Sequence, residues 1–186
     1  MRRELTLARM MTVLRAVEKN GRWFFSARNA SSITGIHDMT TVARDLAYYV
    51  ESGMIEHVGE GVYAFRISSM VPDDAQEILM GALRPNDLNY VSFECVLNQY
   101  GIISQVPTVL TVATTGADGL YESPSYRIEF NHVEHGFREI IENCSSSGNH
   151  ILTASPKLAV SDLMSIGRNT HLIMEEEIAE AQKFYR

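Results

Sequence analysis

Apolar residues in the first 50 positions recur with the spacing of amphipathic helices. The pattern from Leu5 to Lys19 predicts a helix that ends at Asn20-Gly21, because glycine is common just past a helix C-terminus. A second pattern starts at Asp38, whose carboxylate can cap the first turn, and it ends at Ser52-Gly53. The residues predicted to face the core are Leu7, Met10, Met11, Leu14 and Val17 in the first helix and Met39, Val42, Leu46, Tyr49 and Val50 in the second.

A shorter helix is predicted between these two. The polar segment SARNASSITG, from Ser26 to Gly35, indicates a helix followed by a turn at Gly35. Beyond residue 54, apolar residues alternate loosely around Gly59-Glu60-Gly61, which predicts a two-stranded hairpin. Helix, turn, helix and hairpin in this order are typical of a winged helix-turn-helix, whose second helix enters the major groove of DNA. We therefore expect residues 1–72 to form a winged helix-turn-helix DNA-binding domain.

The rest of the chain, residues 73–186, alternates between helical and strand patterns after a boundary at Val71-Pro72-Asp73-Asp74. The pattern predicts helices at 74–83, 92–99, 156–166 and 174–184, a helix or a turn at 137–143, and strands at 109–114, 126–133 and 151–154. A turn is expected at 116–119 and a loop at 145–149. The expected fold class is α+β, with the winged helix-turn-helix followed by a compact mixed α+β C-terminal domain.

The charge distribution changes what the composition implies. The net charge of −7 argues against a nucleic-acid partner when it is taken over the whole chain. Residues 1–44, however, contain eight Lys and Arg against three Asp and Glu, a net charge of +5. Residues 73–186 contain seven basic and sixteen acidic residues, a net charge of −9. Because phosphate contacts need only local positive potential, this asymmetry favours two parts with different partners.

Other features narrow the class of protein. No apolar run is long enough to span a membrane, the N-terminal MRRELTLARMM lacks an apolar signal core, and the two cysteines fit a reducing compartment, so we expect a cytoplasmic protein.

The segment TTGADGLYESP matches no phosphate-binding loop motif. Asp118, Glu122 and Glu129 would suit a nuclease, but position 131 is Asn where such a site usually has Lys. We expect no enzyme, no cofactor and no metal site.

The second helix of the predicted DNA-binding domain supplies the candidate base contacts. Arginine is the side chain best suited to a bidentate bond with guanine, so Arg44 is the main candidate. The alternative is that Arg44 is a solvated helix charge paired with Asp45 or Tyr48. Hydroxyl and arginine side chains on the preceding helix suit phosphate contacts, and the hairpin tip forms the wing. The predicted DNA-contacting residues are Arg28, Ser31, Ser32, Thr40, Thr41, Arg44, Tyr48, Gly59 and Gly61.

A family resemblance covers most of the chain. The segment from Tyr90 to Val133 reads YVSFECVLNQYGIISQVPTVLTVATTGADGLYESPSYRIEFNHV, with Tyr-Gly-Ile, then Pro107 before a Val/Thr-rich strand. Downstream, TASPKLAVSDLM looks like a helix that begins with Ser155-Pro156. Together with the preceding winged helix, this order resembles the AbiEi antitoxin family of bacterial type IV toxin–antitoxin systems, which act in abortive infection by phage.

The resemblance implies a bifunctional, non-enzymatic protein. The winged helix would bind inverted repeats upstream of its own operon and repress transcription, with two copies on the DNA. The C-terminal domain, marked by Tyr90, Ser92, Pro107, Ser155 and Pro156, would counteract a nucleotidyltransferase-like toxin, directly or indirectly. The alternative is a winged-helix transcriptional regulator whose C-terminal domain senses a small ligand.

Overall fold

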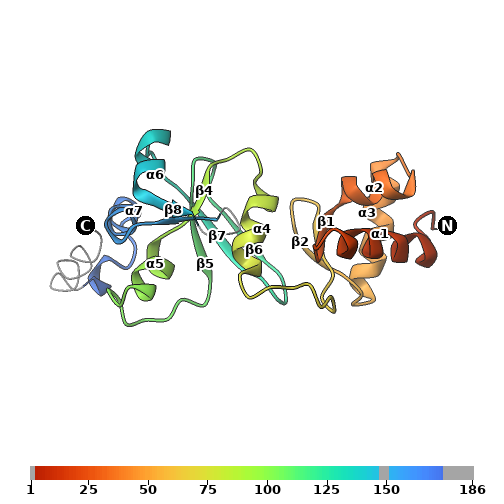
Figure 1. Cartoon of the computed structure of the whole chain (residues 1–186), viewed down its shortest axis with the longest axis horizontal. Helices are drawn as coiled ribbons and strands as arrows, with labels where there is room; N and C mark the ends of the chain where they lie inside the picture. The colour runs from red at the N-terminus through yellow and green to blue at the C-terminus, as the bar shows by residue number, and fades with distance from the viewer. Residues whose placement is uncertain (1–2, 147–150, 174–186) are drawn as a thin grey trace. The chain divides into compact units, whose positions relative to one another are not determined.

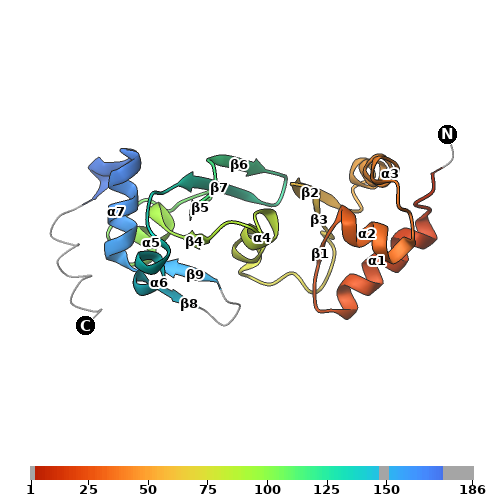
Figure 2. The same cartoon turned by 90° about the horizontal axis from the view of Figure 1, so that it is seen from above.

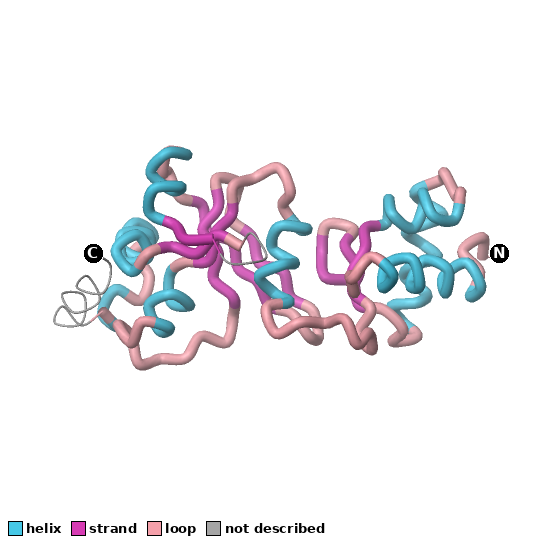
Figure 3. Tube along the Cα trace, viewed as in Figure 1, coloured by secondary structure: helices cyan, strands magenta, loops and turns pink. Residues whose placement is uncertain are grey.

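The computed structural model describes residues 3–146 and 151–173. Over these residues the protein is mixed α+β, with seven α-helices and two β-sheets (Figures 1 and 3). The chain divides into two compact units. One contains Met1–Ala75 with Glu122–Tyr126, and the other contains Gln76–Tyr121 with Arg127–Arg186.

The described part of the first unit contains three helices and a three-stranded sheet (Figure 1). Its elements follow one another as α1 (Leu7–Lys19), β1 (Phe24–Ser26), α2 (Ala27–Thr34), α3 (Met39–Glu51), β2 (Glu56–Gly59) and β3 (Val62–Ala64). The strand order is β1-β3-β2, and both pairings are antiparallel. Tyr63 of β3 lies opposite Phe25 on one side and His57 on the other. The sheet of this unit therefore has three strands, because β1 pairs with the predicted hairpin of β2 and β3.

Short polar side chains fix where each helix of the first unit begins. Thr6 caps α1 by accepting the Arg9 N–H, and Ser26 caps α2 in a reciprocal capping box with Asn29. Asp38 caps α3, as expected from the sequence. Gly35 ends α2 with φ 71°, a left-handed conformation that glycine adopts without steric cost. The predicted helix limits at Gly35 and Asp38 are thus confirmed.

The buried residues of the first unit differ in part from those that the sequence predicts to face the core. Leu7 is 57% exposed, Met11 37% and Met39 40%, so the prediction that these three face inward was wrong. Val13 of α1 is buried instead, because the packed stripe of this helix is rotated slightly from the one that the spacing suggested. Ile36, in the turn between α2 and α3, is also buried. The buried cluster comprises Leu5, Met10, Val13, Leu14, Val17, Phe25, Ala30, Ile36, Val42, Leu46, Tyr49, Ile55 and Tyr63.

The second unit is built on a six-stranded mixed sheet in the order β6-β7-β5-β4-β9-β8 (Figure 2). Its strands are β4 (Asn89–Val91), β5 (Leu110–Thr114), β6 (Gly119–Glu122), β7 (Arg127–His132), β8 (Cys144–Ser146) and β9 (Leu152–Ala154). Its helices are α4 (Ala75–Leu83), α5 (Phe93–Gln99), α6 (Phe137–Asn143) and α7 (Pro156–Ile166), followed by the short 3-10 helix η1 (Thr170–Leu172). Strands β5 and β7 run parallel, as do β4 and β9, while β4–β5 and β8–β9 are antiparallel.

Several short strands were not predicted. Residues 145–149 were expected to form a loop, but Cys144–Ser146 is strand β8, which pairs with β9. The strands β1, β4 and β6 were also missed, because three or four residues are too few to show an alternating pattern. The expected helix at 174–184 lies outside the described residues. No helix within residues 3–146 and 151–173 has the length and apolar character needed to cross a membrane.

Candidate functional site

The α2–turn–α3 segment of the first unit carries most of the residues singled out from the sequence. After Gly35, the turn is held by Ser31, whose backbone carbonyl accepts the Gly35 N–H at 2.8 Å. The Ser31 hydroxyl donates to the carbonyl of Ile36 at 2.7 Å, and Ser31 is only half-exposed. Ser31 therefore stabilises the turn through its hydroxyl, and its contact with a phosphate stays a prediction.

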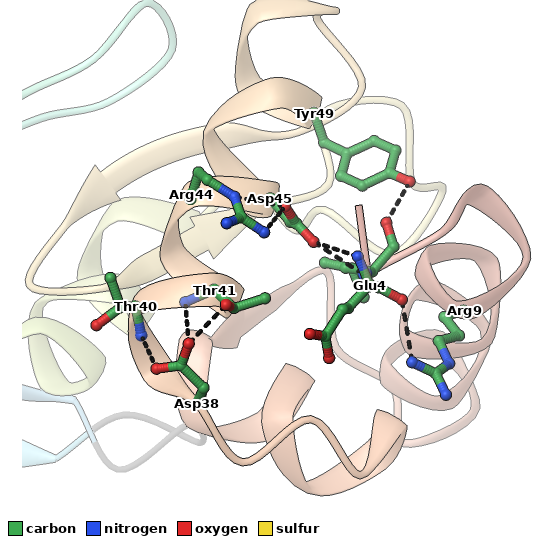
Figure 4. A network of polar contacts seen from close by, with 9 residues as sticks. Glu4, Arg9, Asp38, Thr40, Thr41, Arg44, Asp45 and Tyr49 are labelled. Carbon is green, nitrogen blue, oxygen red and sulfur yellow. Dashed lines mark hydrogen bonds and ion pairs between the residues drawn. The ribbon is translucent and has the colours of Figure 1, made fainter. Parts of the chain in front are cut away.

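The N-terminus of α3 is organised around Asp38 (Figure 4). Its carboxylate accepts the N–H groups of Thr40 at 3.1 Å and Thr41 at 3.2 Å, together with the Thr41 hydroxyl. These hydrogen bonds, led by the one from the Thr41 hydroxyl, lower the pKa of Asp38 below its ordinary value. Thr40 is exposed, whereas Thr41 is buried at 8% exposure. The prediction that Thr41 lies on the exposed edge was wrong, because its hydroxyl completes the helix cap.

Replacing Thr41 with valine is expected to affect stability and not DNA recognition. Valine keeps the buried volume but removes the hydroxyl that Asp38 accepts, which is expected to cost about 0.5–1.5 kcal/mol of unfolding free energy. Urea unfolding followed by Trp23 fluorescence measures this loss. Thr40→Val is the matched control, since Thr40 is exposed and donates to Asp38 only through its backbone. A Thr41→Val variant of wild-type stability with altered sequence preference on DNA would contradict this assignment.

Arg44 and Asp45 form a close ion pair near the middle of α3. The Arg44 guanidinium donates to Asp45 Oδ1 through Nε at 3.0 Å and through Nη2 at 2.9 Å. The Arg44 side chain is 40% exposed, while that of Asp45 is 1% exposed. Of the two alternatives left open by the sequence, pairing with Asp45 is thus observed. The pair keeps the guanidinium at the surface in a defined orientation, with the carboxylate underneath it.

The Asp45 carboxylate also holds the segment that precedes α1. Its Oδ2 atom accepts the N–H groups of Glu4 at 2.8 Å and Leu5 at 2.9 Å (Figure 4). Burial of Asp45 raises its pKa, but the hydrogen bonds from Leu5, Arg44 and Glu4 outweigh burial, so its pKa lies below the ordinary value. Asp45 is therefore ionised at neutral pH, and it neutralises Arg44 locally without adding an unpaired acid to the surface.

Tyr48 lies one turn further along α3 and is 43% exposed. Its ring packs edge-on against Tyr49, with centroids 5.3 Å apart, and the Arg3 guanidinium lies 3.4 Å above its centre. Tyr49 is buried and donates its hydroxyl to the Leu5 carbonyl at 2.9 Å. Tyr48 is thus accessible as predicted, but one face of its ring is covered by Arg3.

The remaining predicted contacts lie on α2 and the β2–β3 turn. Arg28 and Ser32 of α2 are exposed. Gly59 and Gly61 are half-buried, and both have positive φ, 147° and 69°. The Gly61 carbonyl accepts the N–H of Ala27 at 2.8 Å, so the turn is tied back to the start of α2. The two glycines shape the turn between β2 and β3, as expected for the hairpin tip, and their contact with DNA stays a prediction.

The structure therefore gathers three of the predicted side chains on one face of α3. Thr40, Arg44 and Tyr48 are spaced four residues apart, which places them along one side of a helix, and all three are exposed. Sequence reasoning missed the contact of Arg3 with Tyr48 and the hydrogen bonds from the Glu4 and Leu5 N–H groups to Asp45. A signal existed, because Asp45 falls within the apolar stripe at helical spacing from Val42, and an acid in such a position requires a partner.

The second unit contains a buried polar cluster on α7. Asp162 is fully buried and accepts the Tyr90 hydroxyl at 3.2 Å, the Ser92 hydroxyl, and a hydrogen bond from His135 Nε2 at 2.8 Å. Burial raises the pKa of Asp162, and burial beside Asp162 raises the pKa of Tyr90. Ser155 caps the same helix by accepting the Leu158 N–H at 3.3 Å. Tyr90, Ser92 and Ser155, which carry the family resemblance, thus all support α7.

A pocket of about 180 Å³ lies between α5, the loop before β5, β7 and the end of α7. Its charged lining is Glu94, Glu129 and Arg168, and Pro107 also lines it. Arg168 binds Glu129 at 2.7 and 2.9 Å, and Asn169 donates to Glu94 Oε1 at 2.9 Å. The second Glu94 oxygen is buried without a hydrogen-bond partner among the described residues.

The carboxylates considered for a nuclease do not converge. Asp118 accepts the His132 N–H at 2.6 Å, and Glu129 is paired with Arg168. Within residues 3–146 and 151–173, no group of three or more His, Cys, Asp or Glu side chains is placed to hold a metal ion. No family model matches this chain, and no curated protein is significantly similar to it in sequence.

Proposed function

We propose that the chain is a non-enzymatic, cytoplasmic antitoxin of the AbiEi type that also represses its own operon. The first unit is a winged helix-turn-helix that binds inverted-repeat operator DNA. The second unit counteracts a nucleotidyltransferase-like toxin. The observation that carries the DNA-binding part is the exposed row of Thr40, Arg44 and Tyr48 along α3.

The order of elements supports the winged helix-turn-helix. In such domains the second helix of the helix-turn-helix inserts its N-terminal residues into the major groove. Thr40 and Arg44 lie in the first half of α3 and Tyr48 in the second half. Arg44 is suited to guanine, and Arg28 and Ser32 on α2 are exposed for phosphate contacts.

The charge of the N-terminal segment supports the same proposal. Residues 1–44 have a net charge of +5, and the acidic Asp45 is already paired with Arg44. Release of counterions from DNA makes such binding strongly dependent on salt. Two copies on an inverted repeat double the contacts, so we propose a dimer or paired monomers on the operator.

The antitoxin part of the proposal rests on the resemblance of Tyr90–Val133 and of the Ser155-Pro156 helix to the AbiEi family. Within the second unit this stretch contributes Tyr90 and Ser92, which are buried and donate hydrogen bonds to Asp162 of α7, and Pro107, which lines the pocket. The toxin is counteracted by direct binding or by an indirect route.

Replacing Arg44 with alanine is expected to weaken operator binding by about 1–3 kcal/mol and to relax specificity at one base pair, because a bidentate arginine contact is lost. A mobility-shift titration with DNA from upstream of the gene measures the loss. Arg138→Ala is the control, since Arg138 is exposed and pairs only with Glu142 at 2.7 Å among the described residues. Equal affinity of the wild-type and Arg44→Ala proteins at every operator base would refute the role of Arg44.

The same Arg44→Ala chain separates the two proposed activities. Co-expressed with the neighbouring toxin from an independent promoter, it is expected to rescue growth as well as the wild-type chain, because Arg44 lies outside the second unit. A wild-type chain that fails to rescue would contradict the antitoxin assignment, whatever the result on DNA.

The second candidate is a winged-helix regulator whose second unit senses a small ligand. The pocket beside Glu94 and Arg168 favours it, because the buried Glu94 oxygen lacks a partner among the described residues. A sensor would show operator affinity that changes with a small ligand and would give no rescue from a toxin. The rescue experiment with the full chain therefore distinguishes the two candidates.

A further inference from the structure

The segment Arg3–Leu5, which precedes α1, is fixed against α3. Asp45 accepts the N–H groups of Glu4 and Leu5 at 2.8 and 2.9 Å, and Tyr49 donates its hydroxyl to the Leu5 carbonyl at 2.9 Å (Figure 4). The Leu5 side chain is fully buried in the core. Three hydrogen bonds and one buried side chain therefore hold this short segment in a single position along the helix.

This anchoring places the Arg3 guanidinium on the exposed face of α3. Its central carbon lies 3.4 Å from the centre of the Tyr48 ring, a stacked cation–π contact. Stacking uses the face of a guanidinium, whereas its N–H donors lie in its plane and point outward from the edge. Arg3 is exposed, and within the described residues no hydrogen bond or ion pair engages its side chain.

The position of Tyr48 indicates what Arg3 would meet. Thr40 and Arg44 lie toward the N-terminus of α3, the end that enters the groove most deeply in a helix-turn-helix, and Tyr48 lies in the second half. In that binding mode, a side chain such as Arg3 that lies over the second half of α3 is nearer to the sugar–phosphate backbone than to the base edges. The ligand chemistry that fits an exposed, oriented guanidinium there is a phosphate of the duplex.

We propose that Arg3 is an additional DNA-contacting residue that binds a backbone phosphate, and that Tyr48 positions it. This inference rests on the proposed DNA-binding function. It changes the role assigned to Tyr48, whose ring is the platform for Arg3 and whose hydroxyl is not a base contact. Asp45 then serves both arginines, because it orients Arg44 through Oδ1 and anchors the Arg3–Leu5 segment through Oδ2.

The test uses the full chain and fluorescence anisotropy. The probe is a labelled duplex of about 30 base pairs taken from DNA immediately upstream of the gene, long enough for two half-sites one helical turn apart. A shuffled duplex of equal composition gives the non-specific reference. The variants are Arg3→Ala, Arg3→Lys, Tyr48→Ala and Tyr48→Phe, with Arg138→Ala as the control in the second unit.

Arg3→Ala is expected to weaken binding to both duplexes by the same factor, because a phosphate contact carries no sequence information. Arg3→Ala removes one phosphate contact per subunit. Raising the salt from about 50 to about 200 mM is therefore expected to weaken the binding of one variant subunit by a factor about 3.5-fold smaller than for one wild-type subunit. Arg3→Lys keeps the charge and is expected to retain the wild-type salt dependence. A loss of folding cannot imitate this result, because it changes the active fraction and not the salt dependence.

The Tyr48 variants test the positioning role. Tyr48→Phe keeps the ring and is expected to bind like the wild type, whereas Tyr48→Ala is expected to resemble Arg3→Ala and to add little when combined with it. Weak binding by Tyr48→Phe would overturn the platform role. A wild-type chain that prefers the upstream duplex, with an Arg3→Ala variant of unchanged affinity and salt dependence, would overturn the role of Arg3 alone. A wild-type chain that binds neither duplex would overturn the proposed function itself.

Discussion

Replacing Asp162 with alanine is expected to lower the unfolding free energy by about 2–4 kcal/mol. Asp162 is fully buried on α7 and accepts hydrogen bonds from Tyr90, Ser92 and His135. Alanine leaves the Tyr90 and Ser92 hydroxyls buried without this acceptor, whereas His135 is partly exposed and keeps Glu139 as a partner. Part of this loss is offset because the desolvation of the carboxylate, which raises the pKa of Asp162, is also removed.

Asp162→Asn separates the hydrogen bonds from the charge. Asparagine keeps the shape of the side chain and one oxygen acceptor. The Asp162→Asn variant is therefore expected to lose less unfolding free energy than Asp162→Ala. Urea unfolding followed by far-ultraviolet circular dichroism measures both variants. Trp23 is the only tryptophan of the chain and lies in the first unit, so its fluorescence reports on that unit separately.

Ser161→Ala is the matched control, because Ser161 is the exposed neighbour of Asp162 on the same helix. It is expected to leave the unfolding curve nearly unchanged. An Asp162→Ala curve that overlays this control would show that the cluster contributes little to stability. The cluster also joins β4 to α7 through residues 70 or more positions apart, so its loss is expected to loosen the surface formed by the resemblance segment.

Replacing Asp45 with alanine is expected to have the second large effect, a loss of about 2–4 kcal/mol of unfolding free energy. The variant removes the only carboxylate that accepts the N–H groups of Glu4 and Leu5 among the described residues. The Leu5 N–H is buried, so water cannot replace the lost acceptor easily. Arg44 is partly exposed and is re-solvated, which keeps the loss below that of a fully buried ion pair.

The contribution of Asp45 to the free energy of unfolding is expected to decrease at acidic pH. Its folded pKa lies below the ordinary value, so the folded state favours the ionised form. The stabilisation is therefore fully present above the unfolded pKa and is lost as the pH falls through the lowered folded pKa. Trp23 fluorescence during urea unfolding at a series of acidic pH values measures this. Asp45→Ala should lack this component of the acid dependence.

Glu51→Ala is the control for Asp45, because Glu51 is an exposed acid on the same helix. It is expected to leave stability within about 0.5 kcal/mol of the wild type. If Asp45→Ala and Glu51→Ala unfold alike, the Asp45 hydrogen bonds are not important for holding the N-terminal segment. Neither result depends on DNA, so the stability of the site is tested separately from its proposed use.

The sequence by itself determined the features that depend on neighbouring residues. Asp38 as a helix cap, Gly35 as the end of α2 and the turn at Gly59-Glu60-Gly61 are all local choices. A capping carboxylate reaches N–H groups two and three residues away, and a left-handed residue favours glycine wherever it occurs. The exposure of Thr40, Arg44 and Tyr48 followed from helical spacing in the same way.

Only the tertiary structure decided which polar groups find partners far along the chain. Arg3 on Tyr48, the Glu4 and Leu5 N–H groups on Asp45, and Tyr90 on Asp162 join positions 40 to 72 residues apart. The edge strand β8 likewise forms by pairing with β9. Backbone hydrogen bonds of this kind do not depend on the side chains, so the residues Cys144–Ser146 show no strand pattern in the sequence. Periodicity reports which face of an element is buried. It does not report which donor meets which acceptor, because that depends on how the elements pack.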